Sequence, residues 1–362
     1  MSERVYNFYA GPATLPLPVL EQAQKELLNF HGTGMSVLEI SHRAKDFEEV
    51  IFGAENLVKE LLGLGDDFQV LFLQGGASTQ FSMVPMNFLL EGTTADYILT
   101  GSWSEKALKE AQKVGSIHVA ASTKEGNYQR IPEQKEIMLS ENPVYVHITS
   151  NNTIYGTQWR DFPDTGNIPL VADMSSDMMS RPFDVSKFGL IYAGAQKNLG
   201  PAGVTLVIIR KDFLEKAQPP APTMLKYSTH AEKSSLYNTP PAFAIYMLNL
   251  VLKWLKEQGG LEGIEKTNQE KAAYIYNVID QSNGFYKGHA EKDSRSLMNI
   301  TFTMSNADLE KTFAQEATSQ GFIGLKGHRS VGGLRASIYN AMPVEGCSAL
   351  AEFMKDFMRK NG

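Results

Sequence analysis

The sequence contains few of the groups that build disulfides, metal sites or membrane spans. Cys347 is the single cysteine among 362 residues, which excludes an intrachain disulfide and a cysteine-rich metal site. The seven histidines show no i,i+4 pairing and no neighbouring Cys or Asp cluster, so we predict no metal ion. No apolar run approaches the roughly 20 residues of a bilayer crossing, and the N-terminal residues lack the apolar core of a signal peptide. We therefore expect a soluble, cytoplasmic protein.

An excess of positive charge is also missing. The formal net charge is −6, whereas nucleic-acid scaffolds and membrane-surface binders usually carry a basic excess. We predict neither kind of partner, and an anionic substrate must then be held by a local cluster of cations. With 43% hydrophobic and 20% charged residues, the composition is that of an ordinary globular protein.

Helical and strand patterns alternate from Pro18 to about Gly260, without internal repeats or low-complexity tracts. The apolar runs are mostly continuous, as in parallel strands buried on both faces, and the segments between them show 3.6-residue periodicity. This alternation predicts an α/β layered domain with helices on both faces of the sheet. The predicted strands span residues 69–73, 96–99, 144–148, 170–172, 190–193 and 204–209.

The alternation breaks after residue 217. Five prolines between residues 218 and 241 predict a long loop. A helix over 241–258 follows and closes at Gly259-Gly260. We then expect a strand at 297–303, a helix at 307–320, a strand pair through 327–338 and a last helix from Pro343. These elements predict a smaller α/β domain at 261–362, joined by residues 1–15, beside a large domain at 16–260.

Two charged residues end neighbouring apolar runs. The run 190–193 continues through Gly194-Ala-Gln into Lys197, and the run 168–172 ends on Asp173, twenty-four positions before the lysine. An amine and a carboxylate at adjacent strand ends suit a pyridoxal phosphate enzyme. There the lysine forms a Schiff base with the aldehyde and the carboxylate pairs with the protonated pyridine nitrogen. Spacing alone leaves a second interpretation open, in which Lys197 is a solvated strand end and Asp173 a helix N-cap.

The segment 70–81 combines a strand, the pair Gly75-Gly76, the hydroxyl residues Ser78 and Thr79, and a helix start. Free amide hydrogens and the positive end of the dipole at a helix start suit a phosphate group. Hydroxyl residues also cap helices for purely structural reasons. Trp103 follows a strand at a turn, where it could stack on a planar cofactor ring or be an ordinary core tryptophan.

Two His-Arg pairs, His42-Arg43 and His328-Arg329, lie in loop-like segments, and Arg335 follows Gly332-Gly333. Guanidinium groups match the oxygens of phosphate and carboxylate groups. Each pair alone is typical of a surface ion-pair partner. Together with Arg335, the two pairs would form a site for a small ligand that carries both anions.

Three motifs are far more specific than these spacings. The stretch Tyr192-Ala-Gly-Ala-Gln-Lys197-Asn-Leu-Gly-Pro-Ala-Gly203 resembles the lysine motif of the phosphoserine aminotransferase family. Gly327-His-Arg-Ser-Val-Gly-Gly-Leu-Arg335-Ala-Ser-Ile-Tyr-Asn340-Ala and Asn7-Phe-Tyr-Ala-Gly11-Pro12-Ala resemble that family too, and the similarity covers essentially the whole chain. The resemblance implies the type I pyridoxal phosphate fold, with a mostly parallel seven-stranded sheet, and a homodimer with active sites at the interface.

The resemblance also implies the reaction. The amino group of L-glutamate would pass reversibly to 3-phosphohydroxypyruvate, which gives O-phospho-L-serine and 2-oxoglutarate in serine biosynthesis. Whether 4-phosphohydroxy-L-threonine, from pyridoxine biosynthesis, is also a substrate stays open. Where some members of the family have an arginine, this chain has Ser78, so the resemblance leaves the detailed phosphate contacts around Ser78 and Thr79 open.

Residue roles follow from the resemblance position by position. Lys197 would be the Schiff-base lysine, and Asp173 would pair with the pyridine nitrogen. Trp103 would stack on the ring, and Thr153 would hydrogen-bond the ring hydroxyl. The remaining implied cofactor contacts are Ala77, Ser78, Gln196 and, from the other subunit, Asn238 and Thr239. The implied substrate contacts are His42, Arg43, His328 and Arg329 for the phosphate and Arg335 for the α-carboxylate.

Two other interpretations compete with this one. Another type I pyridoxal phosphate enzyme, such as a serine–glyoxylate aminotransferase or a cysteine desulfurase, shares the lysine chemistry. A desulfurase needs a catalytic cysteine in a mobile loop, whereas Cys347 falls in the predicted C-terminal helix. A glyoxylate-type enzyme has no need for two His-Arg pairs. A non-catalytic protein could also use the glycine-rich turn to hold a phosphorylated metabolite.

Overall fold

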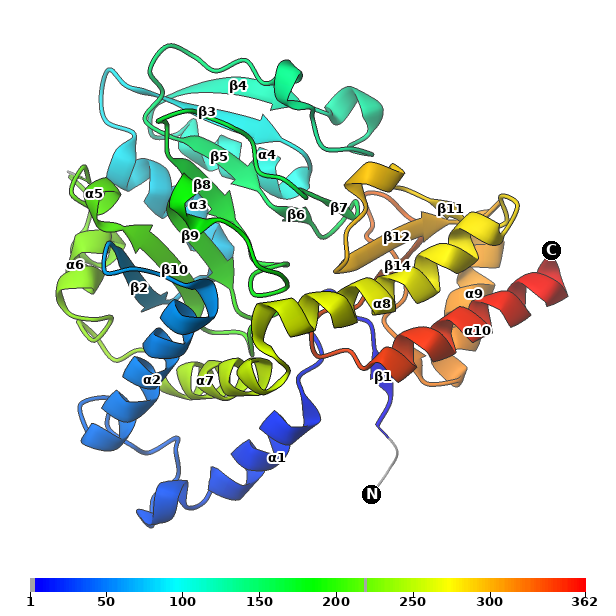
Figure 1. Ribbon diagram of the computed structural model, residues 1–362, viewed down its shortest axis with the longest axis horizontal. Helices are drawn as coiled ribbons and strands as arrows, with labels where there is room; N and C mark the ends of the chain where they lie inside the picture. The colour runs from blue at the N-terminus through cyan, green and yellow to red at the C-terminus, as the bar shows by residue number, and fades with distance from the viewer. Residues whose placement is uncertain (1–3, 218–219) are drawn as a thin grey trace.

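A seven-stranded sheet forms the centre of the computed structural model, which describes residues 4–217 and 220–362 (Figure 1). The strand order is β2-β10-β9-β8-β5-β3-β4, and every neighbouring pair is parallel except those of β10 with β2 and with β9. The predicted α/β fold with a mostly parallel sheet is confirmed. The strands are β2 (Phe68–Leu73), β3 (Thr94–Leu99), β4 (Ser116–Ser122), β5 (Val146–Thr149), β8 (Leu170–Asp173), β9 (Phe188–Gly194) and β10 (Thr205–Arg210).

Successive side chains of these strands enter two different hydrophobic cores. Helices α2 (Lys45–Leu62) and α7 (Ala242–Glu257) cover one face, where they pack with Phe72, Ala172 and Ile191. Helices α3 (Gly76–Phe88) and α4 (Ser102–Ala111) cover the other face, with Leu71, Val171 and Tyr192. Because both faces are buried, the strands need continuous apolar runs, which made them visible in the sequence.

A second sheet has a core of its own. It contains β11 (Lys287–Gly288), β12 (Asn299–Thr303) and β14 (Leu334–Ser337), all antiparallel, and packs on α8 (Gly260–Gln281), α9 (Ala307–Ser319) and α10 (Val344–Asn361). Strand β1 (Tyr6–Asn7) pairs in parallel with β13 (Phe322–Ile323), which brings the N-terminal segment to this core. The division into domains at residue 260 stays a prediction.

The remaining elements are short. Helix α1 (Leu17–Glu26) lies at the margin of the molecule, beside α7 (Figure 1). The hairpin β6 (Asn151–Asn152) and β7 (Thr157–Gln158) lies between the two sheets. The other helices are α5 (Lys211–Leu214), α6 (Tyr227–Glu232), η1 (Phe30–Gly32), η2 (Lys124–Gly126), η3 (Gln134–Glu136), η4 (Val185–Lys187), η5 (Thr223–Leu225) and η6 (Lys292–Ser294).

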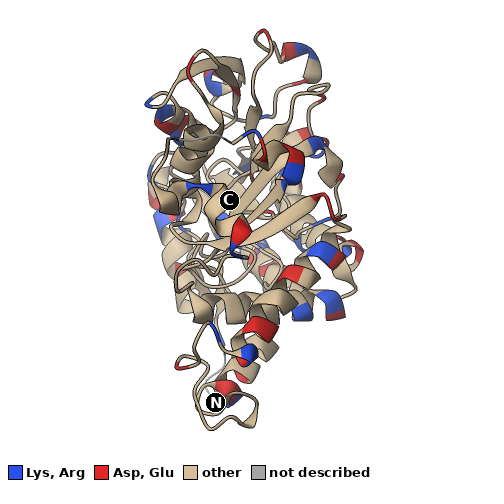
Figure 2. Cartoon of the chain, turned by 90° about the vertical axis from the view of Figure 1, so that its left-hand side faces the viewer, with Lys and Arg blue, Asp and Glu red and all other residues tan. Residues whose placement is uncertain are grey.

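The cartoon in Figure 2 shows acidic and basic residues interspersed along helices and loops. No helix in the described ranges is both long and apolar enough to cross a membrane.

Some elements differ from the prediction. Strand β4 was not predicted, because it lies at the sheet edge and only Ala120 and Ala121 of its residues are buried. Helix α8 was missed as well: it begins directly after Gly259, and its charged residues obscure an apolar stripe that includes Ile264, Ile275 and Ile279. Both errors arise where one side of an element faces water.

Two predicted segments also need correction. The predicted loop 218–241 contains η5 and α6, and Tyr227 of α6 is fully buried with its hydroxyl on Gln80 Oε1 (2.7 Å). Its first residues, Gln218 and Pro219, lie outside the described residues. The predicted strand pair through 327–338 is reduced to β14 and a single bridge between Lys326 and Leu334, because glycines with positive φ interrupt the segment between them.

Phe313→Ala tests the core of the second sheet. The Phe313 ring is fully buried and packs against Phe302, Phe353 and Phe357. We expect the free energy of unfolding, measured by urea denaturation, to fall by about 3–5 kcal/mol. Met138→Ala, at an exposed side chain, is the control and should change it by less than about 0.5 kcal/mol. Equal stabilities of the two variants would contradict this view of the core.

Candidate active site

Loops at the carboxyl ends of several strands converge on one cavity of about 320 Å³. In a parallel sheet these loops meet at the same edge, where ligands bind in open α/β folds. Asp173 ends β8, Lys197 follows β9, Gly75 follows β2, and Trp103 lies in the first turn after β3. The cavity is lined by Ala10, Gly11, Gly75, Gly76, Ala77, Ser78, Trp103, Thr153, Ile154, Asp173, Ser175, Gln196, Lys197, His328 and Arg335.

Lys197 is held with its amine inside this cavity. Its Nζ donates a hydrogen bond to Thr153 Oγ1 (2.8 Å) and lies 5.4 Å from the centroid of the Trp103 ring. Burial is the main cause that lowers the pKa of Lys197, Asp173 opposes it and Arg335 adds to it, and together these effects bring the pKa to about 8. A far larger share of the amine is therefore neutral, and nucleophilic, near physiological pH than for an ordinary lysine, although the ammonium form still predominates.

Asp173 is a buried carboxylate, and only one of its two oxygens accepts hydrogen bonds from the described residues. Its Oδ1 accepts hydrogen bonds from the backbone N–H (3.0 Å) and the hydroxyl (2.6 Å) of Ser175. Burial raises the pKa of Asp173, whereas Lys197 and Ser175 lower it. Oδ2 accepts no hydrogen bond from the described residues, so this oxygen is available to a ligand that donates one.

The glycine pair leaves room for an anion next to the backbone at the start of α3. Gly75 and Gly76 have φ of 88° and 64°, in the left-handed region that favours glycine, and α3 begins at Gly76. A Cβ at Gly75 would lie 1.9 Å from Thr79 Oγ1, whose hydroxyl donates to the Gly75 carbonyl (3.1 Å). Thr79 is thus engaged with the backbone, and of the two hydroxyl residues at the start of α3 it is the exposed Ser78 that lines the cavity.

The Trp103 ring forms one wall. Lys106 Nζ lies 4.0 Å from its centroid, and the indole Nε1 is buried without a hydrogen-bond partner among the described residues. Thr153 enters from the loop between β6 and β7, so the cavity combines groups from separate parts of the chain.

Arg335, in the second sheet, and His328, in the loop before β14, also line the cavity. Arg335, in β14, donates from Nη1 to the Thr153 carbonyl (3.2 Å), and burial lowers the pKa of its guanidinium. His328 Nδ1 contacts the Ser330 hydroxyl (2.7 Å), and burial followed by Arg335 and Arg329 lowers its pKa. A carboxylate bound to Arg335 would lie within the same cavity as the Lys197 amine.

Five predicted site residues do not line this cavity. Arg329 lines a neighbouring hollow of about 700 Å³ against α9. His42 and Arg43 lie in the turn before α2, and Asn238 and Thr239 precede α7. The structure of one chain therefore brings together the predicted cofactor contacts Ala77, Ser78, Trp103, Thr153, Asp173, Gln196 and Lys197, with His328 and Arg335, and leaves these five outside.

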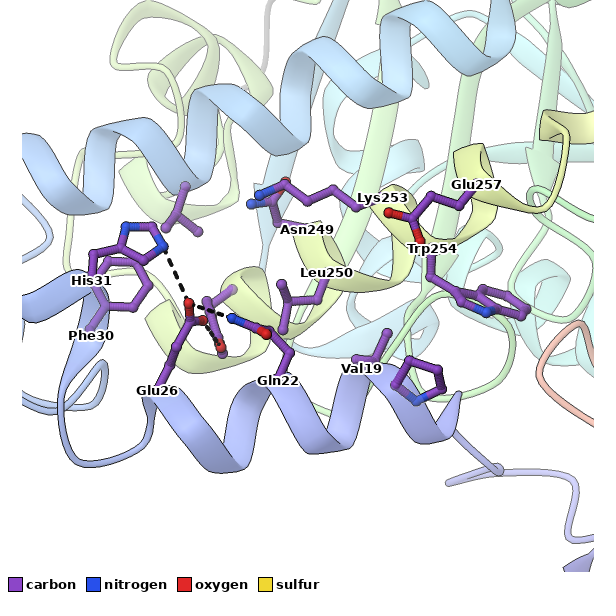
Figure 3. Close-up of a pocket in the computed structure, with 13 residues that line it drawn as sticks. Val19, Gln22, Glu26, Phe30, His31, Asn249, Leu250, Lys253, Trp254 and Glu257 are labelled. Atoms are coloured by element: carbon purple, nitrogen blue, oxygen red, sulfur yellow. Dashed lines mark hydrogen bonds and ion pairs between the residues drawn. The ribbon is translucent and has the colours of Figure 1, made fainter.

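Another pocket, between α1 and α7, contains none of the predicted residues (Figure 3). Its buried Glu26 accepts from Gln22 Nε2 (2.7 Å), pairs with His31 Nε2 (3.3 Å) and accepts from the Tyr246 hydroxyl. The carboxylate is thus already fully engaged, and it fastens the segment after α1 to α7. That segment continues to His42 and Arg43.

Comparison with known proteins identifies the family. The family described as aminotransferase class-V matches residues 5–350. The chain belongs to the class-V aminotransferases. Within this family, it is 64% identical over 358 residues to the phosphoserine aminotransferase of Geobacillus kaustophilus (strain HTA426), with 99% of each chain covered. The predicted resemblance to the phosphoserine aminotransferases is confirmed.

Solved structures of class-V relatives agree over the full length. The phosphoserine aminotransferase from Bacillus circulans subsp. alkalophilus is 58% identical, with a TM-score of 0.98 and 100% of both chains covered. A structure described as pyridoxal phosphate-bound phosphoserine aminotransferase from Trichomonas vaginalis is 40% identical. It has a TM-score of 0.92 and covers 97% of this chain and 100% of its own.

The cavity of this class-V aminotransferase fits pyridoxal phosphate. Asp173 Oδ2 is free to accept a hydrogen bond from a protonated pyridine nitrogen, and the Trp103 face offers a stacking surface. The start of α3 offers unpaired N–H groups to a phosphate. Lys197 supplies the amine that an aldehyde requires.

The sequence did not give a site role to Ser175, Ala10, Gly11 or Ile154, which also line the cavity. Ser175 follows Asp173 by two residues, a spacing at which an Asp side chain often accepts a hydrogen bond from the backbone N–H, so a signal existed. Gly11 lies where an added Cβ would be 3.3 Å from Lys197 Cγ, which only the folded chain reveals.

The lowered pKa of Lys197 predicts how the cofactor-free protein captures pyridoxal phosphate. Only the neutral amine attacks, so the capture rate should rise with pH through about 8 and level off above it. The rate is measured by the visible absorbance, and the covalent link by borohydride reduction and mass spectrometry. Lys197→Ala should show no link. A midpoint near the ordinary value of 10.5 would contradict the predicted environment.

Proposed function

We propose that this chain is a phosphoserine aminotransferase, which transfers the amino group of L-glutamate reversibly to 3-phosphohydroxypyruvate. The products are 2-oxoglutarate and O-phospho-L-serine, in serine biosynthesis, and pyridoxal phosphate is the cofactor. One observation carries the proposal: Lys197, Asp173 and Arg335 line a single cavity in a chain that shares 64% identity with a phosphoserine aminotransferase. The single cysteine agrees with a cytoplasmic location.

Lys197 performs the proton transfers. Pyridoxal phosphate, when bound, supplies an aldehyde that links to amines and a ring that withdraws electrons from the substrate Cα. The neutral Lys197 Nζ would accept the Cα proton as general base and then, as general acid, would deliver it to the carbon of the cofactor that was the aldehyde carbon. Its hydrogen bond to Thr153 Oγ1 (2.8 Å) directs the amine within the cavity.

Asp173 would hold the proton on the pyridine nitrogen through its free Oδ2. The Ser175 hydrogen bonds on Oδ1 fix the carboxylate and stabilise its charged form. Trp103 would stack on the ring, and Thr153 would contact the ring hydroxyl. Ala77, Ser78 and Gln196, at the start of α3 and beside Lys197, would bind the cofactor phosphate.

Arg335 would bind the α-carboxylate that both substrates share. His328 and Arg329 belong to one loop, and they would bind the substrate phosphate with His42 and Arg43. A phosphate carries about −1.5 to −2 charges at neutral pH, which justifies a cluster of cations in a chain of net charge −6.

A second copy of the chain would complete the site. Asn238, Thr239, His42 and Arg43 do not line the cavity of their own chain. The segment before His42 also exposes Leu28 (82%), Met35 (44%) and Leu38 (61%), as expected of a surface that a partner covers. We therefore propose a homodimer in which these four residues enter the partner's active site.

A coupled assay tests the reaction. Purified protein with L-glutamate and 3-phosphohydroxypyruvate should form 2-oxoglutarate, while the non-phosphorylated keto acid should react poorly because it lacks the anion that the cations bind. Comparable kcat/KM values for the two keto acids would refute the proposed substrate.

Arg329→Ala should lower kcat/KM for 3-phosphohydroxypyruvate much more than kcat/KM for glutamate, since only the keto acid has a phosphate. The loss should be about 1.5–3 kcal/mol in transition-state binding, typical of a hydrogen bond to a charged group. Arg359→Ala, at the exposed end of α10, is the control and should change neither kcat/KM. Equal losses for both substrates would assign Arg329 another role.

Mixed dimers test the shared site. Lys197→Ala and Arg43→Ala chains should each be nearly inactive alone. If Arg43 acts in the partner's site, a mixed dimer contains one site with both native residues, and co-expression of the two chains restores activity. If Arg43 acts in its own chain, every site stays defective and activity is not restored.

A further inference from the structure

A fully buried lysine lies near the active site and takes no part in the proposed reaction. Lys271, on α8, is 0% exposed, and no carboxylate among the described residues pairs with it. Burial lowers the pKa of Lys271 to about 8. A buried cation without a counter-ion is costly, so it persists only where other groups hydrogen-bond it.

Three consecutive carbonyl groups bind this amine. Lys271 Nζ donates to the carbonyl oxygens of Ile338 (3.0 Å), Tyr339 (2.7 Å) and Asn340 (3.4 Å). Three acceptors match the three N–H groups of an ammonium. These residues directly follow β14, the strand that contains Arg335. Lys271 therefore fixes the course of the chain as it leaves that strand.

Asn340 extends the contact to the loop of Lys197. Its backbone N–H donates to Asn198 Oδ1 (2.9 Å), on the residue next to Lys197. Its side chain donates from Nδ2 to the Met179 carbonyl (2.7 Å) and accepts at Oδ1 from Asn268 Nδ2 (2.9 Å). Asn340 and Asn198 are 5% and 6% exposed, so neither can exchange these partners for water.

This buried network connects the three chain segments that come after the charged residues of the cavity. Met179 lies six residues after Asp173, Asn198 directly follows Lys197, and Asn340 lies five residues after Arg335. Met179 has a φ of 61°, which is strained for a non-glycine residue and persists only when its surroundings hold it. Sliding β14 past the Lys197 loop would leave several buried polar groups unpaired, and this penalty resists the movement.

We propose that Lys271 is a positioning residue that fixes the Arg335 guanidinium relative to the Lys197 amine, acting through Asn340. The inference rests on the proposed function, in which Arg335 binds the substrate α-carboxylate. The carboxylate is bonded to Cα, so a displaced Arg335 carries the Cα proton away from Lys197 Nζ. Lys271 itself touches neither substrate nor cofactor.

Lys271→Met tests the inference in the protein loaded with pyridoxal phosphate. It removes the three donors and keeps an unbranched apolar chain. The KM for glutamate, the KM for 3-phosphohydroxypyruvate and the dissociation constant of glutarate should rise roughly 10- to 100-fold. Glutarate carries carboxylates but no amino group, so its binding, followed by cofactor absorbance, does not require turnover.

Two further measurements separate positioning from general destabilisation. Covalent capture of pyridoxal phosphate by Lys197 should persist, because the loop of Lys197 and strand β8, which ends at Asp173, are held by the first sheet and not by Lys271. Lys266→Met, at an exposed lysine of the same helix, should behave as wild type. A lower Tm with unchanged glutarate binding and unchanged KM values would give Lys271 a purely structural role and overturn the proposal.

Asn340→Ala keeps the test decisive if Lys271→Met does not fold. It should raise the glutarate dissociation constant in the same way, and wild-type affinity would overturn the proposal. A crystal structure of the variant that folds should show the Arg335 guanidinium displaced relative to Lys197 Nζ, and an unmoved guanidinium would also overturn it. An inactive wild-type protein would refute the proposed function alone, since the glutarate and structural measurements would still report on Lys271.

Discussion

The removal of one amine from water is the condition on which the active site depends. Lys197 can attack an aldehyde only when neutral, and burial is the largest cause of its lowered pKa. Asp173 pulls in the opposite direction, because a nearby carboxylate favours the ammonium. Because these effects balance, both the neutral amine and the ammonium form of Lys197 are accessible near neutral pH. A group that acts in turn as base and acid requires both forms.

The sheet makes this burial compatible with a defined geometry. Lys197 lies in the connection between β9 and β10, where Ala195 N–H donates to Val204 (3.1 Å) and Gly200 N–H to Ala195 (2.8 Å). The loop is therefore hydrogen-bonded within itself. Because β10 is antiparallel, it returns the chain beside β2, and the Gly75 turn lies at the same edge as Lys197. Strand order alone thus brings the anion site and the amine together.

The sequence predicted the parts of the site that local pattern determines. Asp173 and Lys197 were visible because each ends a continuous apolar run, and such runs require strands buried on both faces. Edge strand β4 and helix α8 escaped, because water on one side dilutes the apolar signal. The family resemblance, and not spacing, supplied the roles of Thr153 and Gln196.

Other features were beyond the reach of pattern. The contact of Gly11 with Lys197 depends on segments that meet only after folding. The sequence pattern around Lys271 is that of the exposed side of a charged helix. Its burial is possible because its amine donates to carbonyl groups far along the chain, which only the folded structure brings near. His42, Arg43, Asn238 and Thr239 could not be located from one chain, because their proposed site belongs to a second copy.

Cys347 leaves the molecule with no reactive thiol. The side chain is fully buried in α10, and burial raises its pKa to about 12, so alkylating reagents find no thiolate at neutral pH. Cysteines introduced on the surface of α2 and α9 would then be the only positions to accept a maleimide dye. The native chain is in this way ready for fluorescence measurements of the distance between its two sheets during turnover, without prior removal of any residue.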